Sequence, residues 1–226
     1  GNSMGWYTAL ACAGTLPPTD AFRAANTMGT LMQAAAIGGQ LVHPWMDDDW
    51  GGGDALREAM LAAVARIDGQ DGAILKPSID LGGMLVLAGN NAGLRAFEAS
   101  VDRIGDRFPM RLANHAAFHT ALQEPVAAQA RALLHPTVVQ PSLPLIDGRG
   151  AIWWPGATDT EALWSYTLGA QVTETYDFTR AIRIAAQEFA PDLFIVTGPG
   201  TTLGGAVAQS LVLARWRGIT DKARFK

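Results

Sequence analysis

Residues 1–7 read Gly-Asn-Ser-Met-Gly-Trp-Tyr, a G-x-S-x-G pattern in which Ser3 stands between two glycines. This spacing is typical of a nucleophile elbow, a sharp strand-to-helix turn that exposes a serine hydroxyl, and the glycines remove side chains that would clash across the turn. Residues 6–13 are apolar and stop at Gly14, as expected of the helix that follows an elbow. The positive end of that helix would place the amide of Met4 to receive a developing oxyanion.

The pattern alone is a weak signal, because a chain with 25 glycines is expected to place two of them around a serine by chance. One alternative is that residues 1–3 are the remnant of a tag before a starting Met4. An elbow also requires an incoming strand, and the sequence contains no residues for it. We favour the interpretation that the chain is a fragment of a longer protein whose N-terminal part is missing.

Composition indicates an ordinary globular protein. The chain has 226 residues, 49% of them hydrophobic, which is enough for one large core or for a domain with an insert. A net charge of -4 without a basic cluster argues against binding to nucleic acid or to an anionic membrane surface. The single cysteine, Cys12, excludes an internal disulfide, and we expect it to be a small buried residue. Without a membrane-length apolar run or a signal peptide, the predicted location is cytoplasmic.

After a helix that ends near residue 36, residues 38–112 show the pattern of a ferredoxin-like subdomain. The predicted order is strand, helix, strand, strand, helix, strand, with Asp54 and Asn90 as helix N-caps. The predicted strands are 40–44, 73–79, 84–88 and 108–112, and the helices carry apolar repeats at 56–67 and 94–104. We interpret this unit as an insertion.

The remainder of the chain predicts an α/β core. Helices are expected at 125–134, 159–168 and 178–189, and the apolar run 193–197 has the composition of a parallel strand buried on both faces. A last helix would follow Gly200, and the basic end, 215–226, is expected to be a frayed tail. The predicted fold class is α/β, with an α/β-hydrolase-like parallel-sheet core made of residues 1–37 and 113–226 and interrupted by the ferredoxin-like insert at 38–112.

Two further groups of residues suggest chemistry. The acidic run 47–49 is best interpreted as a solvated loop, because consecutive side chains do not converge on one ion. His115 and His119 are four residues apart and could share a metal on a continuous helix, but no acidic residue follows in the H-E-x-x-H manner. A catalytic base is the alternative interpretation for this segment.

Taken together, several segments resemble the acyltransferase family of malonyl-CoA:acyl-carrier-protein transacylases and polyketide synthase acyltransferase domains. The resemblance covers nearly the whole chain, and its order and spacing are more specific than any single motif. Residues 1–7 resemble the family's G-H-S-x-G-E-Y, residues 117–122 its A-F-H-S segment, residues 145–148 its N-V-D-G, residues 171–178 its Q-L-x-x-P-V-R-W/F, and residues 196–200 with Leu203 its E-x-G-P-G-x-x-L.

The resemblance implies a ping-pong acyl transfer. Ser3 would attack the thioester of an acyl-CoA with His119 as general base, and the acyl group would pass to the thiol of a phosphopantetheinylated acyl carrier protein. Gln171 matches the position whose backbone carbonyl orients the histidine. Acyl-CoA and the carrier protein are the implied partners, and neither a metal nor another cofactor is implied. His115 would be a neighbour of the site.

The departures from the family pattern also carry information. Asn2 replaces a histidine, Trp6 replaces a glutamate that would shape the pocket wall, and Leu145 replaces an asparagine near the histidine. The Gly-Gln-Gly loop that supplies the second oxyanion donor would belong to the missing N-terminal part. Without it, about 3 kcal/mol of transition-state stabilisation would be absent, so we expect the 226-residue chain to be poorly active alone.

Met28 stands where malonyl-selective members carry an arginine that pairs with the substrate carboxylate. A thioether cannot replace a guanidinium there, which suggests an uncharged acyl group. Met28 could equally fill core space, and Arg23 or Arg111 could reach the site instead.

Two other functions remain open on the sequence. A serine hydrolase or thioesterase would use the same Ser3 and His119 and release the acyl group to water. A non-catalytic module that binds a carrier protein or an acyl chain would explain the altered residues around Ser3.

Overall fold

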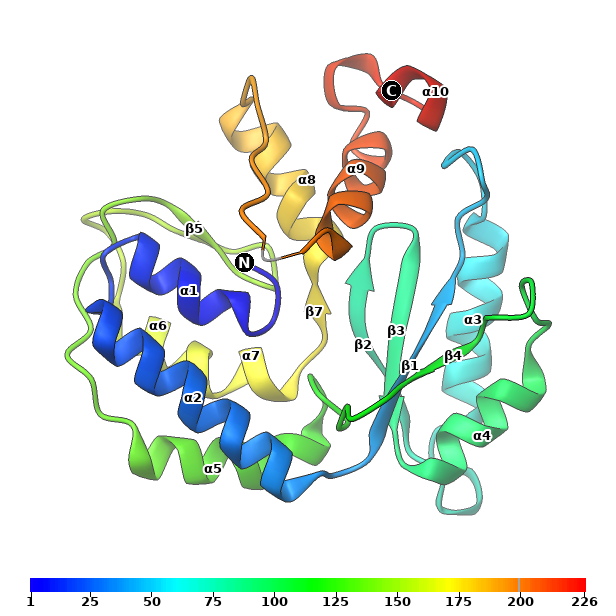
Figure 1. The fold of residues 1–226 in the computed structure, drawn as a ribbon, viewed down its shortest axis with the longest axis horizontal. Helices are drawn as coiled ribbons and strands as arrows, with labels where there is room; N and C mark the ends of the chain where they lie inside the picture. The colour runs from blue at the N-terminus through cyan, green and yellow to red at the C-terminus, as the bar shows by residue number, and fades with distance from the viewer. Residues whose placement is uncertain (199) are drawn as a thin grey trace.

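The computed structural model describes residues 1–198 and 200–226 and shows a mixed α/β fold (Figure 1). The helices are α1 (Gly5–Cys12), α2 (Pro18–Ala35), α3 (Asp54–Ile67), α4 (Asn91–Ser100), α5 (Glu124–Leu133), α6 (Thr160–Leu168), α7 (Ala170–Thr173), α8 (Phe178–Phe189), α9 (Thr202–Leu213) and α10 (Lys222–Phe225). The strands are β1 (Gly39–Pro44), β2 (Leu75–Leu81), β3 (Met84–Gly89), β4 (Met110–Leu112), β5 (Leu145–Ile146), β6 (Ile152–Trp153) and β7 (Tyr176–Asp177).

The main sheet has five strands in the order β4-β1-β3-β2-β7. The first four run antiparallel to their neighbours, which is the arrangement expected of a ferredoxin-like β-α-β-β-α-β unit. At its edge, β7 joins β2 in parallel, with Ile79 opposite Tyr176. This short strand comes from the C-terminal half of the chain, so the sheet connects the predicted insert with the rest of the protein.

Alternation of side chains along the strands separates two hydrophobic cores. In β1 and β3, Leu41, Leu85 and Leu87 pack with α3 and α4 on one face of the sheet. Val42 and Val86 point to the other face and pack with residues of α8 and α9. Figure 1 shows α3 and α4 beside the sheet and α8 and α9 above it.

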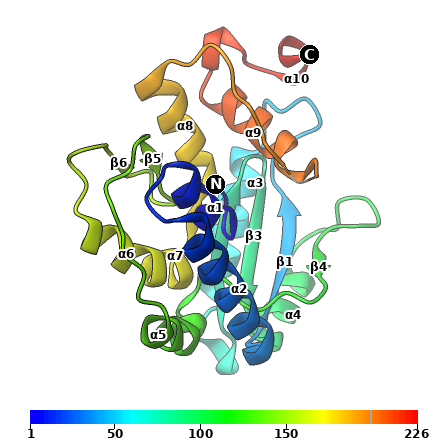
Figure 2. The same cartoon turned by 60° about the vertical axis from the view of Figure 1, so that its left-hand side comes forward.

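The elbow helix α1 lies at the centre of a second, largely helical region. Tyr7 packs with α2, α5, α6 and α7, whereas Trp6 and Leu10 pack with α6 and β5. Figure 2 shows α1 and α2 next to this group of helices. A helix that is apolar around most of its surface is expected to be enclosed in this way.

The apolar run 193–197 is not a strand, contrary to the prediction. Leu193 and Ile195 are 70% and 77% exposed, while Phe194 packs against Trp216 with ring centroids 5.4 Å apart. Apolar composition favours a strand only where a neighbouring strand provides hydrogen-bond partners, and no described strand pairs with this run. The parallel part of the described sheet is limited to β2 and β7.

Three local predictions also need correction. Helix α4 ends at Ser100, not near residue 104, and the Ser100 hydroxyl satisfies the carbonyl of Phe97. Cys12 is exposed instead of buried. The tail is folded, because Phe225 of α10 contacts Trp50 with ring centroids 5.8 Å apart.

One of the two predicted N-caps is confirmed and the other is displaced by one residue. Asn90 is confirmed as the N-cap of α4, since its side chain accepts a hydrogen bond from the amide of Gly93. Gly53 occupies the N-cap position of α3, and Asp54 is the first residue of that helix.

The division into a core and an insert at residues 38 and 112 remains a prediction. In the described part of the chain, no helix is long and apolar enough to cross a membrane.

Candidate active site

Ser3 lies on the tight turn that leads into α1. Its φ angle is 52°, in the left-handed region that residues other than glycine rarely occupy. Such a conformation costs on the order of 1–3 kcal/mol and is often found at functional sites. A Cβ atom on Gly1 would collide with the carbonyl of Gly5, which explains that glycine, whereas a Cβ on Gly5 would meet open space. The steric explanation therefore applies to the first glycine of the motif only.

His119 comes from the loop between β4 and the helix α5 and reaches Ser3 across the molecule. Its Nε2 atom is 2.9 Å from Ser3 Oγ, and its Nδ1 atom is 2.7 Å from the carbonyl oxygen of Gln171. A carbonyl only accepts hydrogen bonds, so Nδ1 carries the proton and Nε2 is left to accept one from the serine hydroxyl. The imidazole therefore has the tautomer that a general base requires.

Burial controls the charge of His119. The side chain is 3% exposed, and this desolvation lowers its pKa to about 4, although the hydrogen bond to the Gln171 carbonyl acts in the opposite direction. His119 is consequently neutral near pH 7 and able to accept a proton.

Gln171 holds both partners of this pair. Besides the carbonyl that binds His119, its side-chain amide donates to the carbonyl oxygen of Ser3 at 3.1 Å. The residue is buried at the first turn of the short helix α7. The structure thus brings together Ser3, His119 and Gln171, and their catalytic roles remain a prediction.

The amide of Met4 is available at the N-terminus of α1. The neighbouring amides of Gly5 and Trp6 donate to the carbonyls of Asn2 and Ser3, at 2.8 and 2.9 Å. Within residues 1–198 and 200–226, the Met4 amide has no such acceptor, so it can donate to an oxyanion next to Ser3.

None of the other predicted contributors forms a described hydrogen bond with the side chain of Ser3 or His119. Met28 is fully buried and packs against Tyr7 and α5, as the core-filling interpretation expects. Arg23 is paired with Asp20, and Arg111 binds Glu98 through two nitrogen atoms.

Trp6 does not form a pocket wall. Its side chain is fully buried, and its indole nitrogen donates to Thr167 at 2.9 Å.

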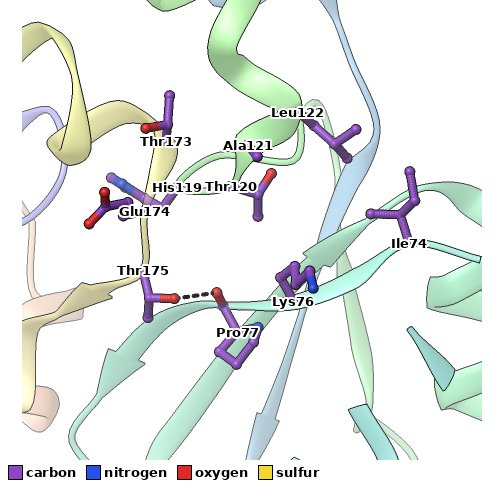
Figure 3. A pocket seen from close by; sticks show the side chains of 10 residues that line it. All are labelled: Ile74, Lys76, Pro77, His119, Thr120, Ala121, Leu122, Thr173, Glu174 and Thr175. Atoms are coloured by element: carbon purple, nitrogen blue, oxygen red, sulfur yellow. Dashed lines mark hydrogen bonds between the residues drawn. The ribbon is translucent and has the colours of Figure 1, made fainter. Parts of the chain in front are cut away.

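Two cavities adjoin the Ser3–His119 pair, one lined by Ser3 and the other by His119. One, of about 600 Å³, is lined by Ser3, Met4, Gly29, Met32, Gln33, Ala36, Gly38, Asn114, His115, Ala116 and Phe118. The other, of about 490 Å³, lies on the far side of His119 between β2 and residues 173–175 (Figure 3). Thr175 closes one side of it by donating to the carbonyl of Pro77 at 2.8 Å.

Tyr176 is a site residue that the sequence did not single out. Its hydroxyl donates to the carbonyl of Gly1 at 2.5 Å, and its ring lies 5.4 Å from that of His119. Gly148 fits against this ring, because a Cβ there would approach Cδ2 of Tyr176 to 2.6 Å. The 145–148 motif therefore contributes to the site through the close packing of Gly148 against the Tyr176 ring. This contact could not be predicted from the motif alone, because it depends on the position of the ring.

The described residues contain no group of three His, Cys, Asp or Glu side chains able to hold a metal ion. His115 and His119 do not share a face. His115 Nδ1 lies 2.7 Å from Gln40 Oε1 in β1, whereas His119 points to Ser3.

Comparisons with known proteins agree with the resemblance drawn from the motifs. No protein-family model matches the chain. A curated malonyl CoA-acyl carrier protein transacylase of Salmonella typhimurium is 26% identical over 209 residues, which are 91% of this chain and 63% of that protein.

Solved structures of such enzymes share the fold. An acyl-carrier-protein S-malonyltransferase from Burkholderia pseudomallei superposes with a TM-score of 0.75 at 24% identity, covering 93% of this chain and 65% of that one. A malonyl-transacylase in complex with a type II polyketide synthase acyl-carrier protein gives the same TM-score, identity and coverage. The chain is thus similar in sequence and fold to malonyl-CoA:acyl-carrier-protein transacylases, and it spans just under two thirds of the length of these three proteins.

Proposed function

We propose that the protein transfers an acyl group from acyl-CoA to the phosphopantetheine thiol of an acyl carrier protein through an acyl-serine. The observation that carries the proposal is the aligned series Ser3 Oγ, His119 Nε2 and Nδ1, and Gln171 O, with contacts of 2.9 and 2.7 Å. These are the distances at which a base can remove the serine proton. The complex with a carrier protein among the similar structures supports the choice of acceptor.

In the first half-reaction, Ser3 Oγ attacks the thioester carbonyl carbon while its proton moves to His119 Nε2. The oxygen that becomes negative is placed to accept a hydrogen bond from the Met4 amide. The carbon–sulfur bond then breaks, and the departing CoA thiolate takes the proton from His119. Gln171 holds the imidazole in one orientation during both proton transfers.

In the second half-reaction, the thiol of the carrier protein gives its proton to His119, and its sulfur attacks the acyl-serine ester. The carbon–oxygen bond breaks, and Ser3 Oγ recovers the proton from His119. The products are an acylated carrier protein and the original enzyme, so atoms and charges balance without a further reactant.

We further propose that the acyl group is uncharged. Met28 is buried at the position of the expected arginine, and the residues that line the cavity beside Ser3 include no lysine or arginine in the described chain. Arg23 and Arg111, the two alternatives, are held by carboxylates elsewhere. A malonyl carboxylate would lose its hydration here without gaining a charge partner, which costs several kcal/mol.

Two expectations from the sequence remain predictions. One is the second oxyanion donor, which we expect from an additional N-terminal segment; the matched proteins are longer than this chain. The other is the cytoplasmic location.

Product analysis separates transfer from the alternatives. The protein is incubated with acetyl-CoA and a carrier protein, and acetyl-carrier protein and free acetate are both quantified. We expect mainly acetyl-carrier protein, and none with a carrier protein that lacks its phosphopantetheine arm. Free acetate as the main product would indicate a hydrolase. Neither product, from a protein that includes the expected N-terminal segment, would favour a non-catalytic binding module.

A further inference from the structure

A row of hydrogen bonds connects the sheet to the loop that carries His119. Gln40 in β1 accepts from His115 at 2.7 Å through Oε1 and donates to Ser78 Oγ at 2.7 Å through Nε2. Ser78 Oγ donates in turn to the carbonyl oxygen of Phe118 at 2.8 Å. Phe118 is the residue immediately before His119, so the row ends one peptide from the imidazole.

The middle of this row is built into the sheet. Gln40 is 2% exposed and Ser78 is fully buried, where polar side chains are stable only when they are hydrogen-bonded. Ser78 is also the extra residue of a β-bulge, since Pro77 pairs with Leu87 and Ile79 with Val86. A bulge changes the direction of a side chain on a strand. At this bulge the redirected side chain is that of Ser78, whose hydroxyl donates to the Phe118 carbonyl.

All donors in the row have a fixed direction. The Phe118 carbonyl can only accept, so the Ser78 hydroxyl proton points to it and the Ser78 oxygen accepts from Gln40. The Gln40 amide is thereby oriented, and its oxygen accepts from His115 Nδ1–H. Removal of one member would leave its buried partner unsatisfied or free to rotate.

The conformation of His119 explains what such an anchor does. The φ angle of His119 is 56°, an unfavourable left-handed conformation that persists only where surrounding contacts impose it. Gln171 fixes the imidazole ring, but the peptide between Phe118 and His119 needs its own restraint. Among the described residues, the side chain that donates a hydrogen bond to the Phe118 carbonyl is that of Ser78. This bond supplies the restraint on the peptide.

We propose that Ser78, oriented by Gln40, is a positioning residue that keeps the His119 imidazole within reach of Ser3. The inference rests on the proposed acyl transfer, because positioning matters only if His119 is the base. Ser78 acts through the backbone and does not touch the substrate, so its loss should slow the chemical step and leave acyl-CoA binding unchanged. A displacement of about 1 Å can reduce a rate by about 100-fold.

The test compares Ser78→Ala with Ser210→Ala. Ser210 is a matched control, because it is equally buried and its hydroxyl also donates to a carbonyl, that of Ala206 in α9 at 2.7 Å. We expect Ser78→Ala to slow acylation of Ser3 by acetyl-CoA about 10- to 100-fold with an unchanged half-saturating concentration. Ser210→Ala should acylate at the normal rate, and Ser78→Thr, which keeps the hydroxyl, should recover most of the activity.

A second measurement does not depend on turnover. Nuclear magnetic resonance titration of His119 reports how well the imidazole is enclosed, since burial is the main cause of its lowered pKa. The titratable groups around it are Tyr176, whose ring is in contact, and Lys76 and Glu174 across the adjoining cavity. None of these changes in Ser78→Ala, so a pKa that rises toward 6.5 would report movement of His119.

The outcomes separate the two proposals. If the protein, extended by the expected N-terminal segment, forms no acyl-Ser3, the proposed function fails, and the titration alone decides the role of Ser78. If the protein is active, but Ser78→Ala keeps both the normal rate and the normal His119 titration, the positioning role is wrong. Equal losses in Ser78→Ala and Ser210→Ala would also overturn it, because they would indicate general destabilisation.

Discussion

At the scale of single residues, burial of His119 makes two properties depend on pH. With a folded pKa of about 4, against about 6.5 when unfolded, the unfolded chain binds more protons between these values. Stability should therefore fall as pH decreases from about 6.5 to about 4, by on the order of 3 kcal/mol from this group. Acylation, which needs neutral His119, should persist until pH approaches about 4.

Denaturant unfolding at several pH values checks the stability part of this prediction, with His119→Gln for comparison. The variant should show a shallower loss of unfolding free energy in the same range. An equally steep loss in both proteins would mean that other groups cause the pH dependence. A pH–rate profile with its acid limb near 6.5 would contradict the enclosed position of His119.

The two histidines near the site should differ in their effect on catalysis. His119 contacts Ser3, whereas His115 is bound to Gln40 and lies at the outer end of the hydrogen-bonded row. We expect His119→Ala to slow acylation by about 100- to 10,000-fold and His115→Ala by much less. Rates of acyl-serine formation in the two variants test this prediction. A greater loss in His115→Ala than in His119→Ala would identify His115 as the base.

The sequence pointed to Ser3, His119 and Gln171, which the structure brings together, but not to the other side chains around them. Ser3 and His119 lie in short motifs with defined spacing, and Gln171 was found by resemblance. Ser78 belongs to no local pattern that predicts its contact with the Phe118 carbonyl. Tyr176 lies in the 171–178 segment, but the resemblance gave no role for its side chain. Their contributions depend on the β2–β7 pairing and on a bulge, which are set by tertiary structure.

At the scale of elements, the prediction about the acyl group depends on residues of α2. Met28 is fully buried on this helix, and Gly29, Met32 and Gln33 line the cavity beside Ser3. We expect acetyl-CoA to outcompete malonyl-CoA for Ser3 in the unmodified protein, because the malonyl carboxylate lacks a cationic partner. Competition between the two thioesters, with the acyl-enzymes separated by mass, measures this preference.

Variants of Met28 define the limits of that prediction. Met28→Leu keeps an apolar side chain in the core and should leave the preference unchanged. Met28→Arg should raise the share of malonyl-enzyme, and it should also lower the melting temperature, because the guanidinium enters a buried cluster. If malonyl-CoA already wins in the unmodified protein, the argument from Met28 is wrong.

Helices were easier to predict than strands in this chain. The periodicity of α3 and α8 and the capping side chain of Asn90 are local, so they are visible in sequence. Residues 193–197 have the composition of a buried strand, but their structure depends on which partners are present. The end of α4 was misplaced because Val101, although in phase with the helix, adopts an extended conformation.

At the scale of the whole molecule, the site is formed where segments from the complete length of the chain meet. Ser3 precedes α1, His119 follows β4, and Gln171 lies in the first turn of α7. The order of these segments was recoverable from the motifs, and the similar structures confirm the overall α/β fold. Their approach to within hydrogen-bonding distance was not recoverable, because it results from packing in two separate cores, one between the sheet and the helices α8 and α9 and one among helices.

Acylation of Ser3 with the help of His119 is the step on which the proposed function depends. Intact-protein mass spectrometry after incubation with acetyl-CoA tests it most directly, with peptide mapping to locate the adduct. Exposed Cys12 is the competing nucleophile, so Cys12→Ser is the matched control for Ser3→Ala. We predict one acetyl group on Ser3 that persists in Cys12→Ser and disappears in Ser3→Ala. An adduct that survives Ser3→Ala, or that maps to Cys12, would contradict it.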